Sequence, residues 1–114
     1  SCSENEVFFT SSGTIANNTA IIGTARTKKR EGKKIITTAL EHPSVIKHFE
    51  MLQEQGFEPV ILKPNVNGKI SLDELSNAVD ENTILVSVMA VNNEVGSIQD
   101  ISKIKSIIKS KKSL

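Results

Sequence analysis

Short apolar runs alternate along the chain with longer segments whose apolar residues recur every three or four positions. The short runs are rich in Ile and Val, which favour β-strands, and the longer segments have the period of an amphipathic α-helix. Such an alternation is typical of an α/β protein with a mostly parallel sheet and helices on both faces. The pattern predicts strands at 6–10, 33–39, 59–62 and 83–91, and helices at 14–30, 43–56, 71–79 and 101–109.

Residues that commonly start or stop helices stand at several of these boundaries. Pro43 falls in a first turn, where its missing N–H is not needed, and Gly56 is an expected helix stop. Ser71 and Glu74 have the spacing of a capping box. The run at 83–91 is almost continuously apolar, which predicts a strand with both faces covered.

Composition narrows the class of protein without identifying it. The 114 residues suffice for one domain, and 14 basic against 13 acidic side chains leave a net charge of +1. That balance gives no argument for binding to nucleic acid or to a membrane surface. The single cysteine, Cys2, excludes an internal disulfide, and no neighbouring base activates it as a nucleophile. The chain has no apolar run near the roughly 20 residues of a membrane span, and no signal peptide is expected.

Polar segments follow three of the predicted strands, at 11–18, 41–44 and 92–99. Ligands of open α/β sheets bind at the carboxyl ends of the strands, where these segments are expected to meet. Each segment is richer in polar residues than a plain connection needs. Their coincidence at one edge of the sheet predicts a binding site there.

The segment Ser11–Thr14 leads from a predicted strand into a helix N-terminus. Free backbone N–H groups and the helix dipole make such a place suitable for an anion, with Gly13 allowing close approach. The segment has no P-loop lysine and no dinucleotide-binding spacing. A plain helix start, with Thr14 as N-cap and Gly13 as a turn residue, is the simpler explanation of this segment taken alone.

His42 stands between a predicted strand and the helix that starts at Pro43. Its imidazole either caps that helix or stacks on a planar ligand and moves a proton, since histidine titrates near neutral pH. The second histidine, His48, is expected to be a solvated surface residue of the same helix. The segment Asn92–Gly96 either forms a turn or uses an Asn amide to hold a ligand oxygen. The basic clusters at 26–34 and 103–112 are interpreted as solvated helix ends.

Taken together, three segments resemble the cysteine desulfurases of the nitrogen-fixation and iron–sulfur cluster type, within the class V aminotransferase superfamily. They are FFTSSGTIANNTAIIG (8–23), KKIITTALEHPSVIKHFEML (33–52) and ILVSVMAVNNEVGSIQDI (84–101), in the family's order and spacing. The resemblance implies that residues 1–114 are part of the large domain of a fold-type I transferase that depends on pyridoxal 5'-phosphate (PLP). It also implies a cytoplasmic homodimer for the parent enzyme.

The same resemblance implies roles for four residues. Gly13 and Thr14 would hold the cofactor phosphate, His42 would stack on the pyridine ring and assist proton transfer, and Asn93 would bond to the phenolic oxygen. The implied reaction takes sulfur from L-cysteine to an enzyme persulfide and releases alanine. A sulfur-acceptor protein would then carry the sulfur toward iron–sulfur clusters or thio-nucleosides.

Several departures from the family pattern bear on activity. Ile15 stands where the family usually has Glu. The family's pyridinium-binding Asp, its nearby Gln, its Schiff-base lysine and its loop cysteine have no counterparts within residues 1–114. We therefore expect the isolated chain to be inactive as a desulfurase. Alternatives are another class V PLP enzyme, such as a selenocysteine lyase or an aminotransferase, and a non-catalytic α/β interaction module.

Overall fold

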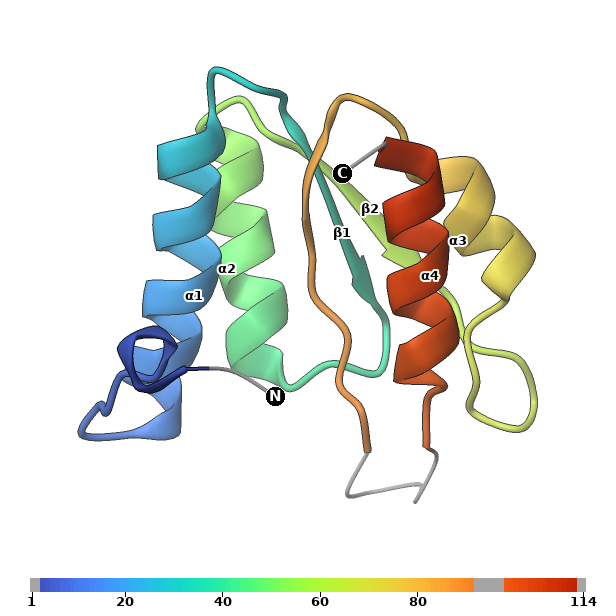
Figure 1. Cartoon of the computed structure of the whole chain (residues 1–114), viewed down its shortest axis with the longest axis horizontal. Coiled ribbons are helices and arrows are strands. Elements are labelled where there is room, and N and C mark those ends of the chain that lie inside the picture. The colour runs from blue at the N-terminus through green and yellow to red at the C-terminus, as the bar shows by residue number, and fades with distance from the viewer. Residues whose placement is uncertain (1–2, 92–97, 113–114) are drawn as a thin grey trace.

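A computed structural model describes residues 3–91 and 98–112 as alternating helices and strands (Figure 1). The helices are a short 3-10 helix η1 (Glu4–Glu6), α1 (Gly13–Lys28), α2 (Pro43–Glu54), α3 (Leu72–Ala78) and α4 (Ile101–Lys112). The strands are β1 (Lys34–Thr38), β2 (Glu58–Leu62) and β3 (Thr83–Val86). Seven of these eight elements coincide with elements expected from the sequence pattern.

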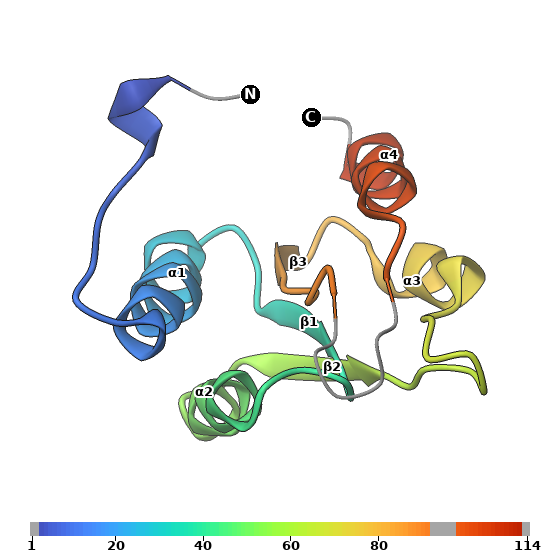
Figure 2. The same cartoon turned by 90° about the horizontal axis from the view of Figure 1, so that it is seen from below.

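The three strands form one parallel sheet in the order β2-β1-β3. In Figure 2, α1 and α2 lie on one side of the sheet, and α3 and α4 lie on the other. At the centre of the register, Ile36 of β1 stands opposite Val60 of β2 and Val86 of β3. The expected α/β class, with a parallel sheet and helices on both faces, is confirmed.

Two hydrophobic cores sit on the two faces of the sheet, because neighbouring side chains of a strand point to opposite sides. Ile35 belongs to the core that α1 and α2 cover, and Ile36 belongs to the core that α3 and α4 cover. Both isoleucines are fully buried. Phe49 of α2 and Leu75 of α3 are the largest buried side chains of their respective helices.

The predicted strand at 6–10 is wrong. The structure has the turn of η1 at Glu4–Glu6 and no strand pairing at 7–10 among the described residues. Phe8 and Phe9 are 83% and 97% exposed, so their side chains add nothing to either core. A strand needs a neighbouring backbone to accept and donate its hydrogen bonds, and no described residue supplies one here.

The third strand of the sheet is shorter than the predicted strand at 83–91. The last ladder bond runs from the Ser87 N–H to the Ile36 carbonyl oxygen at 2.8 Å, after which β1 itself ends at Thr38. The side chains at 84–86 are only partly buried, because β3 lies at an edge of the sheet. The expected strand with both faces fully covered is therefore corrected to a short edge strand.

Asn82 ties together the N-terminal ends of all three strands. Its side-chain oxygen accepts the Lys33 N–H at 2.9 Å, and its carbonyl oxygen accepts the Lys34 N–H at 3.0 Å. Its side-chain amide donates to the Glu58 carboxylate at 3.3 Å at the start of β2. Lys34 in turn contacts the Asp80 carboxylate at 2.5 Å. This network fixes the sheet at the end away from the predicted binding site.

Candidate functional site

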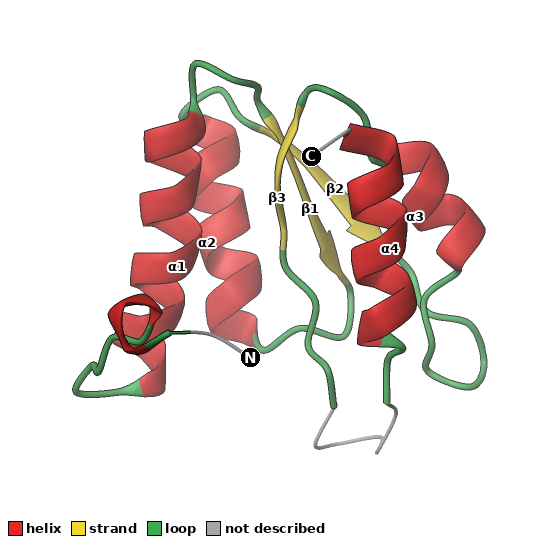
Figure 3. Cartoon of the chain, in the orientation of Figure 1, coloured by secondary structure: helices red, strands yellow, loops and turns green. Residues whose placement is uncertain are grey.

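The helix starts expected to build a site lie on one rim of the molecule. In Figures 1 and 3, the N-terminal ends of α1, α2 and α4 are at the lower edge, toward which the parallel strands run. The first residues of α1 and α2 are Gly13 and Pro43, so two of the predicted polar segments meet this edge. Ligands of open parallel sheets bind on this side.

The start of α1 differs in one detail from the sequence expectation. Ser12, and not Thr14, is the N-cap: its hydroxyl oxygen accepts the Ile15 N–H at 3.2 Å. The Thr10 hydroxyl donates to the Ser12 carbonyl oxygen at 2.8 Å and so holds the approach to the helix. With Ser12 as the cap, the helix begins at Gly13 and the amides of Gly13 and Thr14 fall in its first turn.

Those two amides have no acceptor among the described residues, as is usual for the first turn of a helix. A Cβ placed on Gly13 would meet nothing within 4 Å, and Thr14 is exposed. Two unpaired N–H donors in open space, at the positive end of a 16-residue helix, form a suitable anion site. The helix-start and anion-site interpretations are compatible, because Ser12 supplies the cap and leaves Gly13 and Thr14 free.

His42 caps α2 with its side chain. Its Nδ1 accepts the Ser44 N–H at 3.1 Å and lies 2.9 Å from the Ser44 hydroxyl. A backbone N–H only donates, so Nδ1 is the unprotonated nitrogen and a neutral His42 carries its proton on Nε2. The residue is exposed, which leaves Nε2 and the ring faces accessible. The capping interpretation is therefore confirmed, and stacking of the ring on a planar ligand stays a prediction.

A cleft of about 460 Å³ extends from the first turn of α1 along α2 as far as Glu54. Thr14 lines it from α1, and Ser44, Lys47 and His48 line it from α2. His48 is partly buried, with no hydrogen-bond partner for Nδ1 among the described residues, so the expectation of a solvated surface histidine is wrong. Lys47, which sequence reasoning did not single out, lines the same cleft as Thr14, together with the carboxylates of Glu50 and Glu54.

Glu41 joins the turn after β1 to the segment after β3. Its carboxylate accepts the Met89 N–H at 2.6 Å and the Thr38 hydroxyl at 3.3 Å. Partial burial raises the pKa of Glu41 above its usual value, and the bonds from Met89 and Thr38 oppose that rise. Sequence reasoning placed Glu41 in a polar segment but had no signal for a contact that spans 48 residues.

The third polar segment is only partly visible. Asn93 lies outside the described residues, and so do its neighbours from 92 to 97. Gln99, at the end of the segment, is buried: its side-chain oxygen accepts the Ile70 N–H at 3.2 Å and its amide donates to the Gly68 carbonyl oxygen at 2.8 Å. Gln99 therefore anchors the turn before α3 and is not a candidate ligand contact.

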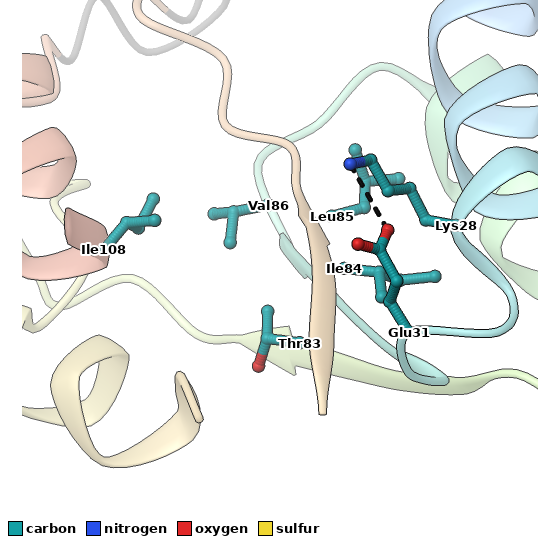
Figure 4. Close-up of a pocket in the computed structure, with 7 residues that line it drawn as sticks. All are labelled: Lys28, Glu31, Thr83, Ile84, Leu85, Val86 and Ile108. Carbon is teal, nitrogen blue, oxygen red and sulfur yellow. Dashed lines mark ion pairs between the residues drawn. The ribbon is translucent and has the colours of Figure 1, made fainter. Parts of the chain in front are cut away.

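A second hollow opens at the free edge of β3, away from the predicted site residues (Figure 4). Thr83 to Val86 form its floor, Ile108 of α4 borders one side, and the Lys28–Glu31 ion pair at 3.3 Å borders the other. Its lining is mainly apolar, and its two charged side chains, Lys28 and Glu31, are paired with each other.

The described residues contain neither a candidate metal cluster nor a candidate membrane span. Within residues 3–91 and 98–112, no three His, Cys, Asp or Glu side chains come together in a way that could hold a metal ion. In the same part of the chain, no helix combines the length and apolarity that a bilayer span requires.

Comparison with known proteins gives consistent matches over nearly the whole chain. Residues 2–114 match the family model described as aminotransferase class-V. Cysteine desulfurase IscS of Colwellia psychrerythraea is 47% identical over 107 residues, which cover 94% of this chain and 26% of that protein. A solved NifS-like protein superposes with a TM-score of 0.93 at 39% identity, covering 97% of this chain and 30% of the other.

A solved structure of SspA in complex with cysteine gives a TM-score of 0.79 at 33% identity, over 85% of this chain and 28% of SspA. The chain thus spans 26–30% of the length of these similar proteins.

Proposed function

The chain belongs to the class V aminotransferase family, and on that premise we propose that it forms part of the PLP-binding large domain of a cysteine desulfurase. The observation that carries the proposal is the start of α1. Two unpaired amides, at Gly13 and Thr14, share one rim with the exposed ring of His42. Relatives named cysteine desulfurase, with 42–47% identity over this region, support the same activity for a protein that contains it.

The residues at this rim fit a phosphorylated pyridine cofactor. The open space at Gly13 and the unpaired amides of Gly13 and Thr14 suit a phosphate group. The exposed imidazole of His42 suits a planar ring. When bound, PLP supplies an electron sink for bonds at the α-carbon of an amino acid.

In this proposal, each residue has a task set by its local geometry. Gly13 and Thr14 hold the phosphate through backbone N–H groups. His42 stacks on the ring and holds or moves a proton at Nε2, because Ser44 occupies Nδ1. Asn93 donates a hydrogen bond to the phenolic oxygen of the cofactor. Ile15, where the family usually has Glu, is 46% exposed and supplies no polar group beside the phosphate.

The proposal extends to the whole protein. Its substrate is L-cysteine, its products are alanine and an enzyme persulfide, and a sulfur-acceptor protein takes the sulfur onward to iron–sulfur clusters or thio-nucleosides. It works as a homodimer in the cytoplasm. The presence of cysteine in the similar SspA structure supports this choice of substrate.

Binding to the 114-residue chain tests the cofactor part. Inorganic phosphate and PLP are titrated separately while the backbone amides are followed by NMR. We expect both ligands to shift the amides of residues 12–16, and only PLP to shift the ring protons of His42. Val66→Ala, at a fully exposed position outside the candidate segments, serves as the control and should leave both sets of shifts unchanged. Absence of any shift at 12–16 with either ligand would contradict the proposal.

A further inference from the structure

After the end of β3, a side chain accepts a backbone hydrogen bond that a neighbouring strand would otherwise accept. Ser87 makes the last backbone bond to β1, and its carbonyl oxygen accepts the Thr37 hydroxyl at 3.1 Å. Two residues later, the Met89 N–H has no strand beside it, because β1 has ended at Thr38. The Glu41 carboxylate accepts this N–H at 2.6 Å and so continues the ladder beyond its last backbone partner.

Glu41 is itself held firmly at the turn after β1. Its own N–H donates to the Thr38 carbonyl oxygen at 3.4 Å, and its carboxylate accepts the Thr38 hydroxyl at 3.3 Å. The Leu40 N–H also donates to that hydroxyl, at 3.3 Å. Thr38 is buried and Glu41 is partly buried, so these bonds are sheltered from water. The turn therefore presents the carboxylate in a fixed place.

The position of Glu41 connects the two parts of the proposed site. The next residue, His42, caps α2, and the segment that Glu41 holds leads from β3 toward the stretch that contains Asn93. We propose that Glu41 is a positioning residue, whose carboxylate fixes the segment after β3 against the turn that carries His42. The expected effect of Glu41 on PLP binding rests on the proposed function. Its contact with the segment after β3 does not.

This assignment predicts a difference between two ligands. Phosphate contacts only the start of α1, which Glu41 does not touch. PLP also needs the ring-binding side of the rim, which depends on the turn and on the segment after β3. Loss of the carboxylate should therefore weaken PLP binding and spare phosphate binding, whereas general loss of structure would weaken both.

The test compares Glu41→Ala and Glu41→Gln with the wild-type 114-residue chain, and uses Glu4→Ala, an exposed change in η1, as the control. In Glu41→Ala, we expect hydrogen exchange at the Met89 amide to become about 10-fold faster or more, as for loss of a bond to a charged acceptor. PLP should bind about 10-fold more weakly, with phosphate affinity within about 2-fold of wild type. Gln keeps an acceptor oxygen, so Glu41→Gln should restore most of both effects.

Three results would overturn the inference: unchanged exchange at Met89 in Glu41→Ala, unchanged PLP affinity, or equal losses of PLP and phosphate. A wild-type chain that binds neither ligand would contradict the proposed function. It would also overturn the part of the inference that concerns PLP binding. A wild-type chain that binds PLP, with Glu41→Ala binding it equally well, overturns the inference alone. If the alanine variant does not fold, the wild-type chain still tests the contact, because a Met89 amide that exchanges as fast as an unprotected amide would overturn the inference.

Discussion

Gly32 and Asn82 are packed backbone against backbone where β1 and β3 begin. A Cβ built on Gly32 would overlap the Asn82 carbonyl group, with 2.8 Å to its carbon. The close approach lets Asn82 accept the N–H groups of both Lys33 and Lys34. Glycine at 32 is thus required by the contact with a residue 50 positions away.

Substitution of Gly32 by alanine should destabilise the protein. The overlap is with backbone atoms, which cannot rotate away, so we expect a loss of about 1–3 kcal/mol in the free energy of unfolding. Gly23→Ala is the matched control, because a Cβ in the middle of α1 meets nothing within 4 Å and should stabilise by about 0.5–1 kcal/mol. Urea unfolding of both variants measures the difference, and equal effects would contradict this account.

The cap at Ser12 gives a second prediction. Ser12→Ala removes the acceptor of the Ile15 N–H and should cost about 0.5–2 kcal/mol of stability. Thr14→Ala, at a position that is not the cap, should cost less. Chemical denaturation with circular dichroism at α-helical wavelengths would measure both changes. A larger loss for Thr14→Ala would instead favour the cap expected from the sequence.

Two substitutions separate the capping role of His42 from its proposed role at the cofactor. Asn is a good N-cap, so His42→Asn should leave the stability of the chain nearly unchanged, whereas His42→Ala should lower it by about 1 kcal/mol. Both variants lack the imidazole, so both should weaken PLP binding. Thermal unfolding and a PLP titration of the same samples give the two readouts. Normal PLP affinity in His42→Asn would remove the histidine from the proposed site.

Glu41 should contribute to stability at low pH, and this contribution should be lost as pH rises above the ordinary carboxyl range. The folded protein raises the pKa of Glu41 above its unfolded value of 4.5, so the protonated form is favoured by folding. This contribution is complete below pH 4.5 and is lost as pH rises through the folded pKa. The hydrogen bond from Lys34 lowers the pKa of Asp80 below its ordinary value of 3.8. The contribution of Asp80 to stability is therefore lost as pH falls, at a lower pH than the effect of Glu41.

Urea unfolding of wild type and Glu41→Gln between pH 4.5 and 7 tests this assignment. The variant should lose the decrease in stability that wild type shows over that range, because Gln does not titrate. The change corresponds to less than about one proton taken up or released on unfolding. Parallel curves for the two proteins would show that other groups cause the pH dependence.

The free edge of β3 should make the isolated chain associate. The outer edge of β3 at 84–86 has no strand beside it in the described structure, and an apolar hollow lined by Ile84 and Ile108 adjoins it (Figure 4). Unpaired edges of this kind pair with other chains. We expect the average mass from light scattering to rise with concentration, and Ile84→Lys to reduce the rise. Val66→Lys, in a fully exposed turn, is the control, and a wild-type monomer at high concentration would contradict the prediction.

Local patterns in the sequence predicted most of the fold. The period of the apolar residues gave α2 and β2 to within about two residues, and the Ser71–Glu74 spacing marked the start of α3, where Ser71 is the cap. Failures occurred where the outcome depends on a distant neighbour. The apolar run at 6–10 has no described strand beside it, and the pairing of β3 with β1 ends at Val86, opposite Ile36.

The candidate site also contains residues that the sequence indicated and contacts that it did not. Local chemistry indicated Gly13, Thr14 and His42, because a glycine at a helix start and a histidine before a proline are visible in the sequence. The bond from Met89 to Glu41 and the cleft shared by Thr14 and Lys47 each join separate elements. No spacing rule reports such contacts, so they required the structure.

The place of β1 between the two cores has a consequence for how the molecule unfolds. Ile35 and Ile36 are adjacent, yet each is buried in a different core. Opening either core exposes one of them and loosens the strand on which the other depends. The two halves should therefore melt as one cooperative unit, with the amides of β1 among the slowest in the chain to exchange with solvent.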